Sequence, residues 1–371
     1  MTIRSVRLVP YRLPLRDPWP TAEGPVLDRH GCLLILEEED GRLGLGDAAP
    51  LPGFGLETIG SCVAALRTAA RRLIGLAADS YLEGAAHLTH LAPVAAAPAA
   101  RHAIDLALHD LAAQRAGVPI AALLGGAEAL VVVPANAVVP RVDAARAGAL
   151  AREAVLAGAR TIKVKVGGGA LHEDLARVRA VREEAGEPVA IRLDANQAWT
   201  EAEALEALAA LRVYGLEYVE QPVSASDVAG LARVRRAGGV PIAADEAACD
   251  ARAVRRLLDA EAADILVLKP MALGGLHAAR AMAALARERG VLVVVTTLVE
   301  SAVGRTGALH LAASLGAGPF AHGVATGPAL LEDVAEGPAM LGGAVPVPRV
   351  PGLGVSLDPR RLREAAVVEA A

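Results

Sequence analysis

Eight apolar, strand-like runs recur along the chain from residue 129 onward, and most are followed by a stretch with helical periodicity. The runs are 130–139, 161–166, 189–196, 216–223, 241–247, 263–270, 291–299 and 319–326. The helical stretches are 143–157, 171–185, 201–212, 226–237, 250–260 and 275–289. Such alternation predicts a parallel α/β sheet, and eight evenly spaced units favour closure into a (β/α)8 barrel over an open doubly wound sheet.

The rest of the chain lacks this period and is expected to form a second unit. Residues 3–10, 31–38 and 41–48 have the character of strands, while 56–75 and 98–116 have the spacing of amphipathic helices. We predict an α+β capping domain at 1–127 and the catalytic barrel at 128–329. A Pro/Gly-rich C-terminal segment at 330–371 is expected to return to the capping domain.

Composition excludes several classes of partner. The 371 residues carry a net charge of −5 without a basic block, which argues against nucleic acid or an anionic membrane. Residues 306–331 lack charged side chains, but their glycines and prolines indicate a buried helix, a turn and a strand rather than a membrane span. Three scattered cysteines and an N-terminus without a secretory signal favour a cytoplasmic protein.

Lysine is rare in this chain. Of its 37 basic residues, 34 are Arg and three are Lys: Lys163, Lys165 and Lys269. Arg stays protonated at ordinary pH, whereas Lys can act as a base once burial or a nearby cation lowers its pKa. Chance survival of a few lysines is the alternative explanation. Their positions at the ends of the second and sixth runs favour a chemical role.

Three acidic residues stand at the ends of the runs between these lysines. Asp194, Glu220 and Asp245 end the third, fourth and fifth runs, about one βα unit apart. Carboxylates that converge at one barrel mouth repel one another unless they hold a cation, and oxygen ligands favour Mg²⁺ over Zn²⁺. Lysines on both sides suit abstraction of a proton next to a carboxylate. Salt bridges across the mouth are the structural alternative.

These residues resemble the motifs of the enolase superfamily, muconate-lactonizing-enzyme subgroup. The matching segments are Lys163-Val164-Lys165, Asp194-Ala195-Asn196, Glu220-Gln221-Pro222, Asp245-Glu246 and Lys269-Pro270. Order and spacing agree over the whole barrel, and the two-part capping domain agrees as well. The resemblance therefore covers essentially the whole chain and implies the superfamily's modified TIM barrel.

The resemblance implies a role for each matched residue. Asp194, Glu220 and Asp245 would ligate Mg²⁺, with Mn²⁺ as an alternative occupant. Lys165 would abstract the proton, Lys163 would assist the substrate carboxylate, and Lys269 would stand on the opposite face. Asn196 and Glu246 would orient the ligands through hydrogen bonds. Glu300 and Ser301, after the seventh run, would support the site and contact the substrate.

The loop Pro50-Leu51-Pro52-Gly53-Phe54 resembles the o-succinylbenzoate synthases, in which a capping loop closes over the substrate. Phe54 is accordingly expected to contact the substrate, although Asp47 stands where these enzymes more often carry Glu. The implied reaction is a lyase step of menaquinone biosynthesis, the dehydration of 2-succinyl-6-hydroxy-2,4-cyclohexadiene-1-carboxylate. Dipeptide epimerases of the subgroup usually carry Asp-x-Asp on the eighth strand, where this chain has His322-Gly323-Val324.

Other functions stay open at this point. N-acylamino acid racemisation suits two flanking lysines equally well, and muconate cycloisomerisation is a further isomerase alternative. A non-catalytic binding protein would have no need for the base or for three metal ligands. We expect a small-molecule carboxylate as the substrate, and a homo-oligomer, with which the Ala-rich barrel exterior is compatible.

Overall fold

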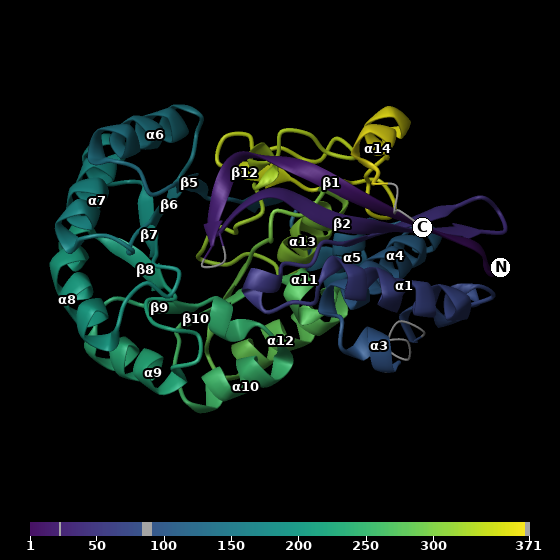
Figure 1. The fold of residues 1–371 in the computed structure, drawn as a ribbon, viewed down its shortest axis with the longest axis horizontal. Coiled ribbons are helices and arrows are strands. Elements are labelled where there is room, and N and C mark those ends of the chain that lie inside the picture. Colours follow the sequence, from purple (N-terminus) through teal and green to yellow (C-terminus); the bar gives the residue numbers. More distant parts are fainter. Residues whose placement is uncertain (22–23, 84–90, 368–371) are drawn as a thin grey trace.

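The computed structural model describes residues 1–21, 24–83 and 91–367, and its centre is a curled parallel sheet (Figure 1). Seven strands lie in the order β11-β10-β9-β8-β7-β6-β5. Their bounds are β5 Ala137–Val139, β6 Thr161–Lys165, β7 Ala190–Asp194, β8 Leu216–Glu220, β9 Ile242–Ala244, β10 Ile265–Leu268 and β11 Leu292–Val295. The prediction of a barrel of βα units is confirmed.

The first and eighth predicted strands differ from expectation. The run 130–139 divides into β4 (Val132–Pro134), which pairs with a C-terminal strand, and β5, because Pro134 has no N–H to continue a ladder. The eighth run forms only isolated bridges, in keeping with its Gly and Pro content.

His322 closes the barrel between its first and last strands. Its backbone N–H donates to the Pro134 carbonyl and its own carbonyl accepts from Asn136, which joins the eighth run to the segment before β5. On the other side, the His322 ring Nδ1 accepts a hydrogen bond of 2.9 Å from the backbone N–H of Val295. One residue thus bonds to both sides of the seam.

Strand alternation decides which residues fill the barrel. Alternate positions of a strand face the same side, so Tyr218, Val267 and Val294 point inward and pack in a small apolar cluster with Phe320. Arg192 lies among them, fully buried, and donates to the Tyr218 hydroxyl and to a carbonyl of the eighth run. The next inward positions along these strands lie at the carboxyl rim.

Helices follow the strands of the sheet, and those from α6 to α10 appear as an arc around it in Figure 1. The helices are α6 Ala144–Leu156, α7 Leu171–Ala185, α8 Glu201–Leu211, α9 Val228–Ala237, α10 Ala251–Asp259, α11 Pro270–Leu273, α12 Leu276–Glu288 and α13 Ala302–Ser314. Side chains of Asp143, Thr200, Asp227 and Asp250 cap the first turns of α6, α8, α9 and α10. The uncharged stretch after Thr306 includes most of α13, which is buried. In the described ranges no helix is long and apolar enough to cross a membrane.

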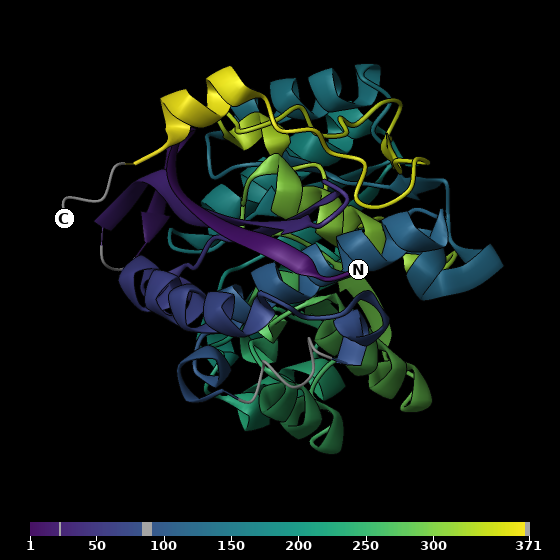
Figure 2. The same cartoon turned by 90° about the vertical axis from the view of Figure 1, so that its right-hand side faces the viewer.

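The N-terminal unit places an antiparallel sheet and helices against the barrel (Figure 2). Its elements are β1 Ile3–Thr21, β2 Gly24–Glu38, β3 Leu43–Ala48, α1 Ile59–Leu73, α3 Ala92–Ala95, α4 Pro98–Ala116 and α5 Ile120–Gly125. β1 and β2 are longer than the sequence pattern predicts. They pair over most of their lengths, with one register shift between Ile3 and Ser5 and another between Pro14 and Trp19 of β1.

The C-terminal segment contacts both units. β12 (Ala344–Pro346) pairs with β4, while Ala366, just after α14 (Pro359–Ala365), forms a bridge with Tyr11 of β1. The domain limits at 127/128 and 329/330 stay a prediction.

The seam predicts a pH dependence of stability. Burial, followed by the charge of Arg192, lowers the pKa of His322 to about 4. The folded state binds this proton more weakly than the unfolded state, so the stabilisation is complete above pH 6.5 and is lost as the pH falls towards 4. From pH 7.5 to 5.0, this residue should cost about 2 kcal/mol of unfolding free energy.

Denaturant unfolding at the two pH values measures this loss. His322→Asn, which keeps an acceptor for Val295, should show a drop smaller by that amount. The exposed His172 on α7 supplies the control variant His172→Asn, which should keep the wild-type drop. An equal drop in wild type and His322→Asn would contradict the assignment.

Candidate active site

Five strand ends bring ionisable side chains to one rim of the sheet. Lys165, Asp194 and Glu220 are the last residues of β6, β7 and β8, and the strand register sets them side by side. Asp245 and Lys269 directly follow β9 and β10. The residues that the sequence predicts to lie together do so because parallel strands end at the same edge.

The two lysines of β6 contact the first two carboxylates. Lys163 Nζ lies 2.9 Å from Asp194 Oδ2 and 2.5 Å from Glu220 Oε1. Lys165 Nζ lies 2.7 Å from Asp194 Oδ2 and 2.8 Å from Asn196 Oδ1. Asp194 and Glu220 are each only 1% exposed, so their charges depend on these partners.

The third lysine approaches from the opposite side of the carboxylate group. Lys269 Nζ donates to Asp245 Oδ1, and the ring of Phe54 lies 4.2 Å from the same nitrogen. Phe54 ends the short 3₁₀ helix Pro52–Phe54 of the capping domain. The predicted capping loop therefore contacts the lysine of β10 directly, in the geometry of a cation–π interaction.

Amide side chains hold the loops that follow the strands. Asn196 Nδ2 donates to Glu246 Oε1 at 3.2 Å, which joins the two residues expected to orient the ligands. Gln221 is buried, and its Oε1 accepts from the backbone N–H groups of Asp245 and Ala247. Asn196 and Gln221 both have positive φ angles, a costly conformation for residues other than glycine.

The charges shift one another's titration. Burial raises the pKa of Asp194, but Lys163 and Lys165 outweigh it and hold that pKa well below its usual range. Burial and the charge of Asp194 raise the pKa of Glu220 to about 7, against the effect of Lys163. Burial likewise raises the pKa values of Asp245 and Glu246. The charge on each of these buried groups thus depends on the charges beside it.

The donor chemistry suits a divalent cation. Asp194, Glu220, Asp245 and Glu246 are four carboxylates that face three lysines, which leaves one negative charge in excess (four minus three). One buried oxygen of Glu246 has no hydrogen-bond partner. The carboxylates contact lysines, and over the ranges described no three His, Cys, Asp or Glu side chains converge on one metal position. The residues fit Mg²⁺ by charge and ligand type, and the ligand assignment is a proposal.

Glu300 and Ser301 occupy a separate buried cluster behind the rim. Ser301 begins α13 as its N-cap, and its hydroxyl donates to Asp47 of β3 at 2.7 Å. Glu300 accepts from the backbone of Leu298, and burial raises its pKa to about 7. Neither residue has a hydrogen bond to the lysines in the described contacts, so substrate contact by this pair stays a prediction.

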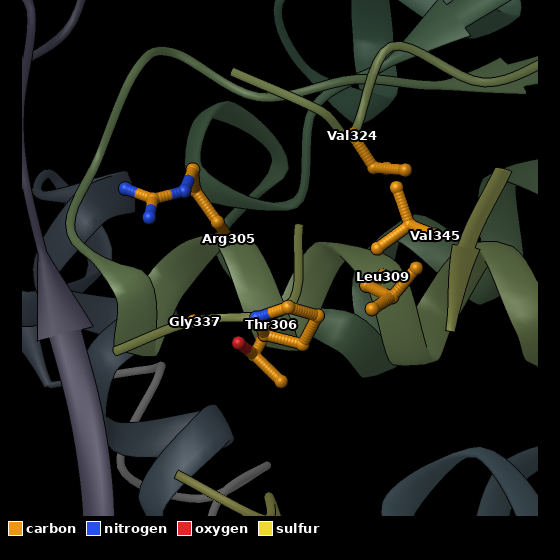
Figure 3. Close-up of a pocket in the computed structure, with 7 residues that line it drawn as sticks. Arg305, Thr306, Leu309, Val324, Gly337 and Val345 are labelled. Carbon is orange, nitrogen blue, oxygen red and sulfur yellow. The ribbon is translucent and has the colours of Figure 1, made fainter. Parts of the chain in front are cut away.

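A small pocket lies elsewhere, between α13 and the C-terminal segment (Figure 3). Its lining includes Arg305, Leu309, Val324 and Val345. None of the lysines or carboxylates of the rim lines it. The Arg305 guanidinium forms an ion pair with Asp333 at 2.8 Å, and this pair balances the positive charge of Arg305.

Three residues that support this geometry escape the sequence pattern. Gln221 lies within the segment Glu220-Gln221-Pro222, but nothing in the sequence assigns it the loop contacts that it makes. Tyr11 and Arg29 lie in the capping strands and are both buried, where Tyr11 donates to Asp47 and Arg29 donates to the carbonyls of Ala49 and Pro50. No spacing rule in the sequence predicts these contacts.

Comparison with known families agrees with this geometry. Residues 3–125 match the mandelate racemase / muconate lactonizing enzyme N-terminal domain, and residues 146–361 match the enolase C-terminal domain-like family. An o-succinylbenzoate synthase of Thermobifida fusca is 42% identical over 242 residues, which cover 64% of this chain and 72% of the relative.

Solved structures extend the similarity to nearly the whole chain. The N-succinyl Arg/Lys racemase of Bacillus cereus has a TM-score of 0.90 at 28% identity and covers 99% of both chains. A dipeptide epimerase of Enterococcus faecalis, complexed with Mg and L-Leu-L-Tyr, has a TM-score of 0.88 at 30% identity. It covers 96% of this chain and 100% of its own.

The carboxylate group predicts a divalent-metal affinity that single substitutions reduce. Isothermal titration with Mg²⁺ should show binding that Glu220→Gln weakens more than about tenfold, because even indirect partners of a metal cost 10–100-fold. Glu206→Gln, a matched change at an exposed position of α8, should leave the affinity unchanged. Equal affinities of wild type and Glu220→Gln would refute the ligand assignment.

Proposed function

Because the chain belongs to the mandelate racemase / muconate lactonizing enzyme family of the enolase superfamily, we propose that it removes a proton adjacent to a substrate carboxylate. The observation that carries the proposal is the pair of lysines, Lys165 and Lys269, on opposite sides of one group of buried carboxylates. Asp194, Glu220 and Asp245 would hold Mg²⁺. When bound, the metal would supply Lewis-acid stabilisation of the negative charge that develops on the substrate.

Each residue of the rim then has a role in the proposed reaction. In its neutral form, Lys165 Nζ takes the proton from the carbon next to the carboxylate. Lys163 faces the same carboxylates and helps to place the substrate's carboxylate by its positive charge. Lys269, held by Asp245 and covered by Phe54, stabilises the enediolate from the other face. Asn196 fixes the position of Lys165 through its 2.8 Å hydrogen bond.

The proposed reaction is o-succinylbenzoate synthesis by dehydration. After proton abstraction, the bond between ring carbon and hydroxyl breaks, and Lys165 returns its proton to the departing hydroxyl as water leaves. The ring thereby becomes aromatic. Relatives with this name are 42–46% identical to the chain over more than 60% of its length, which supports the choice. The absence of Asp-x-Asp on the eighth strand argues against a dipeptide substrate.

Racemisation of an N-succinylamino acid is the second candidate. Lysines on opposite faces could remove a proton on one side and deliver one on the other. The similarity to the N-succinyl Arg/Lys racemase over the whole chain favours it. Both candidate substrates carry a succinyl group and a carboxylate next to the reacting carbon, so the same rim could serve both.

One experiment separates these reactions. The purified enzyme with Mg²⁺ is incubated in D₂O with the cyclohexadiene carboxylate or with an N-succinylamino acid. Loss of diene absorbance reports dehydration, and deuterium incorporation at the α carbon reports racemisation. Lys165→Ala should lower whichever rate is present by at least about 10²-fold, since acid–base catalysis contributes about 10²–10⁴-fold.

A chelator control and the Mg²⁺ affinity of Lys165→Ala accompany the assay. Retained metal affinity in the variant ties the lost rate to the base rather than to the metal site. Wild-type activity on neither substrate, or full activity in Lys165→Ala, would overturn the proposed function.

A further inference from the structure

The carboxylate of Asp47 joins the capping domain to the barrel. Asp47 lies in β3 and is fully buried. Its Oδ1 accepts from the Tyr11 hydroxyl at 2.7 Å, within the capping sheet. Its Oδ2 accepts from the Ser301 hydroxyl at 2.7 Å and from the Ser301 backbone N–H at 3.1 Å, on the barrel side. All three partners donate to the carboxylate, whereas an amide would replace one of its two acceptor oxygens by an NH₂ donor.

The backbone just before Ser301, the residue that donates two of these hydrogen bonds, is strained. Val299 has a φ of +58°, a conformation that β-branched residues rarely adopt. Such strain persists only where surrounding contacts hold it, and here they come from both ends of the segment. Glu300 accepts from the backbone of Leu298, and Arg305 donates to the Glu300 carbonyl at 2.8 Å. Asp47 then fixes Ser301.

Close packing leaves Asp47 little freedom. A Cβ at Gly304, in the first turn of α13, would lie 2.7 Å from Asp47 Oδ2 and 2.6 Å from Glu300 Cγ. The backbone carbonyl of Asp47 contacts His102 Nδ1 of α4 at 2.7 Å. Any shift of the carboxylate must therefore move the helix or the turn as well.

The loop that directly follows Asp47 and Ala48 leads to the rim. β3 ends at Ala48, and the buried guanidinium of Arg29 donates to the carbonyls of Ala49 at 2.7 Å and Pro50 at 3.2 Å. The same loop continues to Phe54, which covers Lys269. Only a short loop therefore separates Asp47 from Phe54, which contacts Lys269 of the rim. The Asp47 carboxylate is also hydrogen-bonded to Ser301, in the segment that follows β11.

We propose that Asp47 is a positioning residue that fastens the capping loop 49–54 to the turn Leu298–Ser301 and thereby sets how tightly the substrate is held. Asp47 touches none of the rim lysines and carboxylates, so it acts through the two segments and not on the reacting atoms. That a carboxylate substrate is held rests on the proposed function. The coupling of the two segments rests on the observed contacts alone. Removing the hydrogen bonds between Asp47 and Ser301 should weaken substrate binding more than it slows proton abstraction.

The first test needs no substrate. Hydrogen exchange, followed by mass spectrometry in the full-length protein, should be at least about tenfold faster in a peptide spanning 298–303 for Asp47→Asn and Ser301→Ala, since a bond to a charged group is lost. Ser5→Ala removes a similar hydroxyl–carboxylate bond, to Glu37 in the capping sheet, and should leave this peptide unchanged.

Gly304→Ala crowds the same contact without altering either hydrogen-bonding group. The added methyl group would lie 2.7 Å from Asp47 Oδ2 and 2.6 Å from Glu300 Cγ, so it should displace both side chains and speed exchange of the same peptide. Gly60→Ala in α1, where a Cβ would meet nothing within 4 Å, is the matched control. If Asp47→Asn fails to fold, the Gly304 and Ser301 variants still decide the result. Unchanged exchange in the folded variants would overturn the proposal.

The second test uses whichever carboxylate the wild type turns over. Asp47→Asn and Ser301→Ala should raise KM about tenfold while kcat stays within about threefold, and the double variant should be no worse than the worse single one. A fall in kcat at constant KM, or additive effects of the two changes, would contradict positioning. If the wild type turns over none of the substrates, the proposed function fails, whereas the exchange result still decides the coupling.

Discussion

Burial of carboxylates at the carboxyl rim of the sheet is the constraint on which the site depends. Asp194 and Glu220 follow an inner layer formed by apolar and aromatic side chains and the buried Arg192, and both are almost completely withdrawn from water. Charges in that setting are tolerable only with compensating charges nearby. The chain supplies these through its only three lysines, Lys163, Lys165 and Lys269, and each of them contacts a carboxylate of the rim.

The same arrangement makes the lysines chemically useful. Each lysine packed against a carboxylate is held in a fixed position, so its amine nitrogen is already oriented at the rim. The capping domain completes the environment of one of them by placing Phe54 over Lys269. The barrel thus provides the charges, and the N-terminal unit places an aromatic ring against one of them.

Much of the barrel and its rim could be predicted from the sequence. Apolar runs at regular intervals locate the strands, and charged residues at their ends locate the rim, because both signals are local or periodic. The seam was harder to predict, since Pro319 and Gly323 reduce the eighth strand to isolated bridges. The Asp47–Ser301 contact joins residues 254 positions apart, and the positive φ of Val299 has no marker in its residue type.

A crystal structure with Mn²⁺, read by anomalous scattering, tests the central claim most directly. The account predicts one metal ion bound by carboxylate oxygens of Asp194, Glu220 and Asp245, with the Lys165 and Lys269 amines on opposite sides of it. Absence of metal from this rim at saturating Mn²⁺, or its binding by other residues, would contradict the account.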